Sequence, residues 1–348
     1  MLSVIREFTD IHSVSGNEFK IRTKIIEKIT PLADSITVDT MGNLIAFKKG
    51  RISGNKKILV CAHMDEVGFI ISDITDDGFL KFKCVGGIDP RIMLAQNVLI
   101  GENSVGGVIG IKAVHLQNAQ EQNSVVKPKD MYIDIGASSK EEAQSLVKKG
   151  DYACFDSGFT ELGGGLIKAK ALDDRAGCAM LCELMKNKYE SDLYFCFSVQ
   201  EEVGVRGARV IARRLNADAA IILEGTTCSD IAGVKPHEFA TVCGNGPVVS
   251  IMDRASYSDK NLNRFICQIA EKSKIPFQFK QSAMGGNDAG AYQNAAAACK
   301  TSVISLPCRY IHSPVSCAST DDINNMYSLA ENVLENIHTF DCGNRSEN

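Results

Sequence analysis

Hydrophobic and polar positions divide the chain into three stretches with different spacing. Residues 1–67 show apolar residues at helical spacing up to about residue 32, an alternating hairpin pattern around residues 36–47, and the apolar run ILVCA at 58–62. Residues 68–163 contain short runs rich in Val, Ile and Gly, with turn residues every 8 to 12 positions or so. From residue 164 onward, apolar runs again alternate with helical patterns.

These patterns predict an α/β fold with an insertion. Strands that alternate with helices are typical of a mostly parallel sheet covered on both faces. Short strands at regular spacing favour a small β-barrel or sandwich. We therefore expect a split α/β domain, formed by residues 1–67 and 164–348, that carries an inserted β-rich domain of residues 68–163.

Composition narrows the class of protein. The 348 residues are 45% hydrophobic and carry a net charge of −4, whereas nucleic-acid binders usually show a basic excess. The 13 cysteines show no CxxC pair, which is typical of a reducing compartment. No apolar run approaches the roughly 18 residues of a membrane helix. We expect a soluble cytoplasmic protein that binds neither nucleic acid nor membranes.

Five predicted strands end in residues that can bind metal ions. In a sheet of parallel strands, the carboxyl ends meet at one edge, and ligands bind there. Histidines and acids from distant parts of the chain should therefore lie together. These residues are His63, Asp65, Asp173, Asp174, Glu201, Glu202, Glu224 and His312.

Each of these features has a simpler interpretation when it is taken alone. A histidine after a strand is usually a hydrogen-bonded structural residue, Asp-Asp before a helix is often an N-cap, and Glu-Glu is normally a solvated turn. Taken together, converging carboxylates need cations, and Arg175 and Arg206 are too few. Two imidazoles and three carboxylates suit two divalent ions, with zinc, cobalt or manganese favoured over magnesium or calcium.

The motifs AHMDEVG, ALDDRAG, QEEVGVRGA, ILEGTT and RYIHSP occur in this order along the chain. Together with SVSGNE near the start and GGNDAGA near the end, they resemble the M42 family of metallo-aminopeptidases, which includes glutamyl and tetrahedral aminopeptidases. The resemblance implies a dimetal aminopeptidase-like fold, two divalent metal ions per subunit, and short peptide substrates. It also implies self-association through the inserted β-rich dimerisation domain, as a dimer or a dodecameric shell.

The resemblance also implies a role for each metal ligand. Asp173, followed by Asp174, looks like the carboxylate that bridges the two ions. His63 and Glu202 would hold one ion, while Glu224 and His312 would hold the other. Zinc is the first expectation for both ions, with cobalt or manganese as alternatives.

Two further acids receive catalytic roles from the same resemblance. Glu201 would be the general base that takes a proton from a metal-bridging water, so that hydroxide attacks the scissile carbonyl. Asp65, two residues after His63, would orient that histidine. The resulting hypothesis is an aminopeptidase that removes N-terminal residues from short peptides.

Departures from the family pattern keep alternatives open. Glu224 stands where many members carry Asp, and Asn287 stands where Thr is more common, so the substrate class is not fixed. A dimetal carboxypeptidase would need an arginine for the terminal carboxylate, and Arg309 is a candidate. An N-acyl deacylase on the same scaffold is a further alternative. The non-enzyme alternative is an inactive shell or binding protein.

Overall fold

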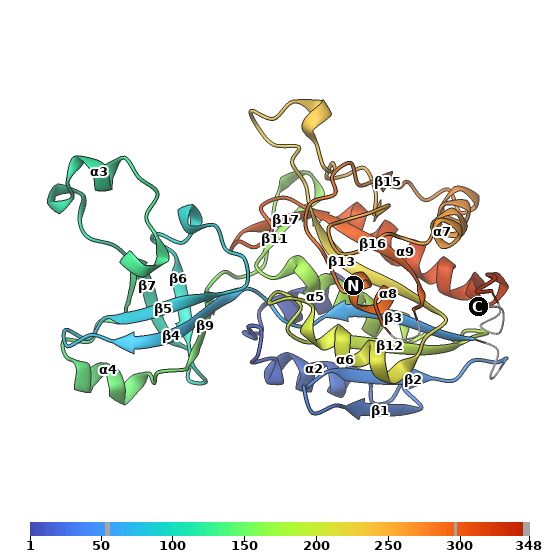
Figure 1. Cartoon of the computed structure of the whole chain (residues 1–348), viewed down its shortest axis with the longest axis horizontal. Coiled ribbons are helices and arrows are strands. Elements are labelled where there is room, and N and C mark those ends of the chain that lie inside the picture. Colours follow the sequence, from blue (N-terminus) through green and yellow to red (C-terminus); the bar gives the residue numbers. More distant parts are fainter. Residues whose placement is uncertain (53–55, 296–297, 344–348) are drawn as a thin grey trace.

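The computed structural model describes residues 1–52, 56–295 and 298–343, and in these residues a large sheet and a closed barrel form two distinct bodies (Figure 1). The eight-stranded sheet has the order β1-β2-β12-β3-β13-β16-β14-β15. Its central strands β12, β3, β13 and β16 run parallel. Their bounds, in sheet order, are Ser35–Val38, Leu44–Lys48, Asp192–Ser198, Lys57–His63, Ala219–Thr227, Lys300–Cys308, Val248–Val249 and Gln278–Phe279.

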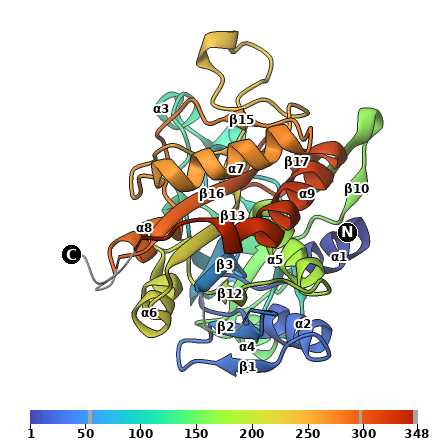
Figure 2. The ribbon, with the colours of Figure 1, turned by 90° about the vertical axis from the view of Figure 1, so that its right-hand side faces the viewer.

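Alternate residues of the central strands face two separate cores, so helices cover both faces of the sheet. In β3, Ile58 and Val60 belong to one core, while Leu59 and Cys61 belong to the other. Figure 2 shows α2 and α5 on one side of the strands and α6 on the opposite side. The first core includes α1 (Leu2–Thr9), α2 (Phe19–Ile29), α5 (Leu172–Leu184), α7 (Lys260–Lys272) and α9 (Thr320–Asn336), and the second includes α6 (Arg206–Leu215) and α8 (Ala289–Gln293).

The predicted small β-barrel is confirmed as a closed barrel in the order β4-β5-β8-β7-β6-β9. It has its own apolar core, in which the Phe69 ring packs edge-on against Phe82 and Phe155 at centroid distances of 5.0 and 5.2 Å. The strands are Gly68–Ile74, Leu80–Val85, Tyr132–Asp134, Val105–Gly110, Asn97–Ile100 and Tyr152–Phe155, and the helices α3 (Ala119–Gln122) and α4 (Lys140–Leu146) complete this part.

A three-stranded sheet connects the barrel region with the main sheet. Strand β11 (Leu166–Ala169) pairs with β10 (Thr160–Glu161) on one side and with β17 (Ser316–Ser319) on the other. Because β11 leads directly into α5, this small sheet supports the start of that helix. None of the helices in the described parts of the chain has the length and apolar character needed to cross a membrane.

Candidate active site

The predicted strand-end residues gather at the carboxyl edge of the large sheet. His63 is the last residue of β3, Glu224 lies in β13, and Asp173 is the second residue of α5. Glu202 follows β12 and His312 follows β16, each four residues beyond the strand end. Parallel pairing of β12, β3, β13 and β16 brings these positions to one edge.

Asp173 lies at the centre of the cluster and directs one carboxylate oxygen toward each histidine. Its Oδ1 is 3.2 Å from His63 Nε2, and its Oδ2 is 3.4 Å from His312 Nε2. Each imidazole also meets a second acid: His63 Nε2 is 3.3 Å from Glu224 Oε1, and His312 Nε2 is 3.2 Å from Glu202 Oε2. The nearest contacts therefore form two groups of side chains, each with one histidine and one glutamate, that share Asp173.

The nearest side-chain contacts join these residues in a different pairing from the one that the sequence predicted. The prediction placed His63 with Glu202 and Glu224 with His312, whereas the nearest contacts join His63 to Glu224 and His312 to Glu202. The physical reason is depth along the sheet. His63 and Glu224 lie within neighbouring strands, whereas Glu202 and His312 lie in loops that extend beyond the strand ends.

The acids of this cluster are buried close to one another. Burial raises the pKa of Glu202 to about 7. Burial, followed by the charge of Glu224, raises the pKa of Asp174 well above its usual value, and burial likewise raises the pKa of Glu224 and Glu201. Two imidazoles cannot neutralise this many carboxylates, and bound cations can. The donor set of imidazoles and carboxylates therefore fits divalent metal ions.

Atom groupings around His63 are consistent with this fit. One ligand atom from each of His63, Asp173 and Glu202 lies within 4.8 Å of the other two, and the same holds for His63, Asp174 and Glu224. Asp174 also has structural contacts, since its Oδ1 accepts a hydrogen bond from the Gly177 amide at 3.0 Å and its Oδ2 accepts one from the His63 amide at 3.2 Å. Asp174 thus holds the main chain of His63 in place.

Asp65 contacts His63 chiefly through its main chain. The Nδ1 atom of His63 is 3.0 Å from the Asp65 carbonyl oxygen and 3.6 Å from the Asp65 carboxylate. The carboxylate accepts hydrogen bonds from the amides of Glu201 and Glu202, at 3.0 and 3.1 Å, and from the Ser15 hydroxyl at 2.5 Å. One fully buried acid thus fixes both a histidine and the loop with the two glutamates.

Two further residues hold this glutamate loop, and sequence reasoning missed both. Glu18 Oε1 accepts a hydrogen bond from the Gln200 amide at 3.2 Å, and Asn43 Oδ1 accepts one from the Val199 amide at 3.0 Å. Gln200 adopts a positive φ of 57°, a conformation that needs support from its surroundings. Glu18 ends the SVSGNE motif, which contributes to the family resemblance but does not by itself assign a role to this glutamate.

His312 is held by a residue from the barrel side of the molecule. Its Nδ1 atom is 2.9 Å from the carbonyl oxygen of Gly87, which follows the barrel strand β5. Burial alone lowers the pKa of His312, but the carboxylates of Asp173 and Glu202 outweigh this effect and raise its pKa to about 9. The Gly87 carbonyl accepts the Nδ1 hydrogen and leaves Nε2 facing the acids.

The cluster forms one wall of a cavity of about 830 Å³. Asp173, Glu201, Glu202 and Glu224 face this cavity, and its other walls include Asn287 from the GGND motif. The Asn287 side chain is engaged elsewhere, because its Nδ2 donates to Asp253 at 2.9 Å and its Oδ1 accepts from the Ala289 amide. The cavity can therefore admit a peptide end beside the carboxylates.

Arg309, the candidate for binding a terminal carboxylate, is already paired. Its Nε and Nη2 atoms donate to the two carboxylate oxygens of Asp230 at 3.0 and 2.7 Å. This bidentate ion pair uses the planar fork that would otherwise recognise a substrate carboxylate. The geometry thus removes the residue on which the carboxypeptidase alternative depended.

Comparison with known proteins gives a consistent result. The family model described as M42 glutamyl aminopeptidase matches residues 42–329. A putative aminopeptidase of Acetivibrio thermocellus is 41% identical over 331 residues, which cover 94% of this chain and 97% of that protein. An aminopeptidase of the archaeon Desulfurococcus kamchatkensis, APDkam598, has a similar structure, with a TM-score of 0.91, 35% identity, and coverage of 96% of this chain and 94% of that one.

A further solved structure is informative about assembly. It belongs to the TET1 peptidase of Pyrococcus horikoshii, which can assemble into a tetrahedron or a large octahedral shell. Its TM-score is 0.86 at 36% identity, and the match covers 96% of this chain and 98% of that one.

Proposed function

The chain belongs to the M42 glutamyl aminopeptidase family, whose members are peptidases and therefore hydrolases, and from this premise we propose that it is a dimetal aminopeptidase acting on short peptides. The observation that carries the proposal is the position of Asp173 between two histidines, each with its own glutamate. A shared carboxylate of this kind suits a pair of ions, since one oxygen is available to each.

Five residues would hold the two ions. His63 and Glu224 would bind one, His312 and Glu202 would bind the other, and Asp173 would bridge them. When bound, the ions would neutralise the carboxylates, lower the pKa of a water molecule and polarise the scissile carbonyl. Zinc is the first candidate, and cobalt or manganese suits the same ligands.

Glu201 is the proposed general base. It lines the cavity beside Asp173 and Glu224, and Asp65 holds its amide. Burial raises the pKa of Glu201, which suits a carboxylate that takes a proton from the attacking water and returns it to the leaving amine near neutral pH. The Asp65, Asn43 and Glu18 contacts keep this side chain aimed at the cavity.

Self-association is proposed through the barrel region of residues 68–163. Several large apolar side chains of this region are exposed, which favours burial against a second subunit. They are Val108, Val114, Leu116, Val125 and Leu146. By analogy with the shell-forming TET1 peptidase, the assembly would be a dimer or a dodecamer built from such dimers.

The test uses metal-stripped protein and a panel of aminoacyl chromogenic substrates. We expect no turnover without metal, and recovery with zinc, cobalt or manganese in proportion to the ions bound per chain. A free peptide and its N-acetylated form should then differ, because an aminopeptidase requires the free amine. Equal hydrolysis of the blocked peptide would instead favour the N-acyl deacylase alternative.

A further inference from the structure

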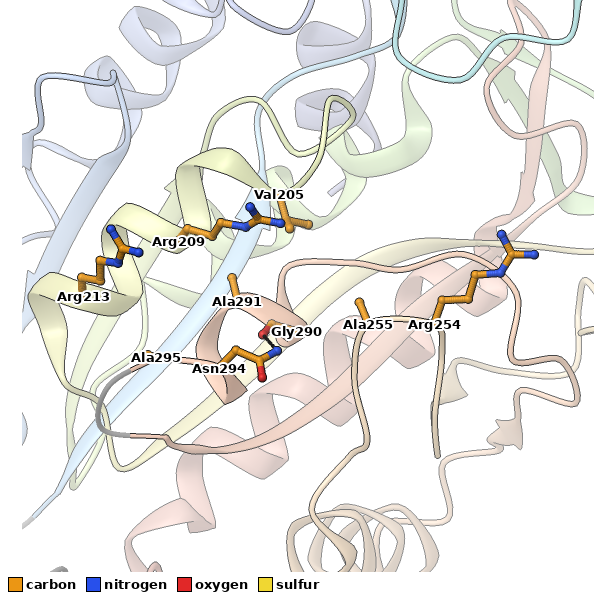
Figure 3. A pocket seen from close by; sticks show the side chains of 9 residues that line it. All are labelled: Val205, Arg209, Arg213, Arg254, Ala255, Gly290, Ala291, Asn294 and Ala295. Carbon is orange, nitrogen blue, oxygen red and sulfur yellow. Dashed lines mark hydrogen bonds between the residues drawn. The ribbon is translucent and has the colours of Figure 1, made fainter.

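A second cavity, of about 400 Å³, lies next to the active-site cavity. Three arginines line it: Arg209 and Arg213 from α6, and Arg254 from the loop after β14 (Figure 3). The two cavities share wall residues, since Val205 and Ala255 border both. We call the second cavity the arginine pocket; it adjoins the active-site cavity at these two residues.

The arginines of this pocket have no carboxylate partner within ion-pair distance among residues 1–52, 56–295 and 298–343. The neighbouring Arg214 differs, because it faces Asp39 at 3.6 Å. Arg254 stands at the junction of the two cavities, where its Nη2 is 3.3 Å from the sulfur of Met284, a residue of the active-site wall. Three guanidinium groups without a carboxylate partner in the described parts of the chain thus line this pocket.

Small residues keep the pocket open. Gly290 and Ala291 of α8, together with Ala295, form its floor in Figure 3. A side chain at Gly290 would come within 2.7 Å of the Ala255 carbonyl oxygen, so the glycine permits the close approach of the two walls. The floor contributes no acid, which leaves the positive charge of the arginines unopposed within the pocket.

The two adjoining cavities carry opposite charges, as do the two ends of a peptide zwitterion. The first contains the carboxylates of the proposed metal site and suits the free amine end, whereas the second contains the arginines. We propose that the arginine pocket binds the carboxylate at the far end of a short peptide whose first residue lies at the metal site. This inference rests on the proposed aminopeptidase function, because that function fixes which end of the peptide enters the acidic cavity.

Arginine suits this role because its planar fork can hold a carboxylate through two parallel hydrogen bonds. Arg209 and Arg213 are four residues apart on α6, so their side chains lie on the same helix face. Both are exposed, so each contact is screened by water and salt. We therefore expect a moderate effect on KM rather than on kcat.

The main experiment compares a tetrapeptide that has a free C-terminal carboxylate with the same peptide as its C-terminal amide. In the double variant Arg209→Gln/Arg213→Gln, KM for the free acid should rise about five- to tenfold, while KM for the amide changes less than about twofold. Added salt should raise the wild-type KM for the free acid and leave the amide nearly unaffected. The matched control is Arg264→Gln, on the exposed side of α7.

A second series distinguishes two sources of the carboxylate. Amidated peptides with Glu or Gln at the third, fourth or fifth position report binding of an acidic side chain, and free-acid peptides of increasing length report binding of the terminus. An extended residue spans about 3.3 Å, so the preferred length locates the bound group. A length preference in the free-acid series that the double variant loses supports the proposal, whereas a loss confined to the amidated Glu peptides would overturn it, because it would assign the pocket to an acidic side chain.

Three further outcomes would overturn it: equal KM changes for acid and amide, no change for either, or a loss of assembly in the double variant measured by light scattering. The last result would assign the arginines to a contact between subunits. An aminoacyl chromogenic substrate, which has no distal carboxylate, separates this inference from the proposed function. Absence of turnover of every such substrate by the metal-loaded wild type would refute the function itself.

Discussion

The carboxyl edge of the large sheet and the interior of the barrel bury side chains of opposite character. At the sheet edge His63, Asp65 and Asp174 are 0–1% exposed, whereas the barrel interior holds residues such as Phe69 and Ile133. Apolar burial stabilises a fold, while a buried charge costs free energy unless it is paired. This difference indicates that burial in the barrel lowers the free energy of the fold. The buried acids and histidine at the sheet edge instead cost free energy, which is expected of residues that serve a chemical function.

The largest expected effect is at Glu201. Glu201→Gln keeps the shape of the side chain and removes the proton acceptor, so kcat should fall about 10²- to 10⁴-fold while metal content stays unchanged. Steady-state kinetics and elemental analysis of the same preparation measure both quantities. The control is Glu141→Gln, on the barrel helix α4, which should keep wild-type kcat. Wild-type turnover in Glu201→Gln would remove this residue from the mechanism.

The second-largest effect is expected on metal binding and tests which proposed ligands bind the same ion. His312→Ala and Glu202→Ala should each lower the affinity for the same metal ion by at least about 100-fold. The double variant should still bind the other ion. His63→Ala and Glu224→Ala should behave in the same way toward the other ion. Ions per chain after dialysis, measured by mass spectrometry, test this directly. Matching behaviour of His63→Ala with Glu202→Ala would restore the pairing predicted from the sequence.

A smaller effect is expected at Glu18, which acts on the glutamate loop from outside the cavity. Glu18→Ala removes the acceptor of the Gln200 amide, and kcat should fall about tenfold with KM and metal content unchanged. Glu18→Gln keeps one acceptor oxygen and should recover part of the loss. The neighbouring Asn17→Ala, at an exposed position, is the control. A fall in thermal stability without a fall in kcat would show that Glu18 has a purely structural role.

The smallest change is expected in the barrel. Phe69→Leu keeps the apolar character and loses the edge-on contacts with Phe82 and Phe155, so the free energy of unfolding should fall by about 1 to 1.5 kcal/mol. Turnover per folded molecule should stay at the wild-type value. Urea denaturation and active-site titration measure the two quantities. A large loss of kcat here would contradict the division of roles between the two regions.

The sequence was sufficient to predict the α/β class, the barrel and the gathering of the strand-end residues, because apolar runs identify strands and parallel strands align their ends. It could not supply the pairing of His63 with Glu224, since depth along a sheet depends on loop geometry. Nor could it connect Asn43 with Val199, which lie 156 positions apart. The roles of the ligands and of Glu201 remain predictions.

The strand order of the barrel also could not be predicted from the sequence. Strand β8 lies between β5 and β7, so neighbours in space are not neighbours along the chain. Alternation of apolar residues identifies which face of a strand is buried, but it does not specify the partner strand. The same limitation applied to Gly87, whose contact with His312 joins positions 225 apart.

That contact has a consequence for protein engineering. A shortened enzyme from which the barrel is excised would have to provide a substitute for the Gly87 carbonyl, because the imidazole of His312 would otherwise be free to rotate and to exchange its tautomer. A displacement of the segment after β5 would move the acceptor of the same imidazole. A replacement of the barrel by that of a relative therefore has to preserve the Gly86–Gly87 segment after β5, whose carbonyl contacts His312.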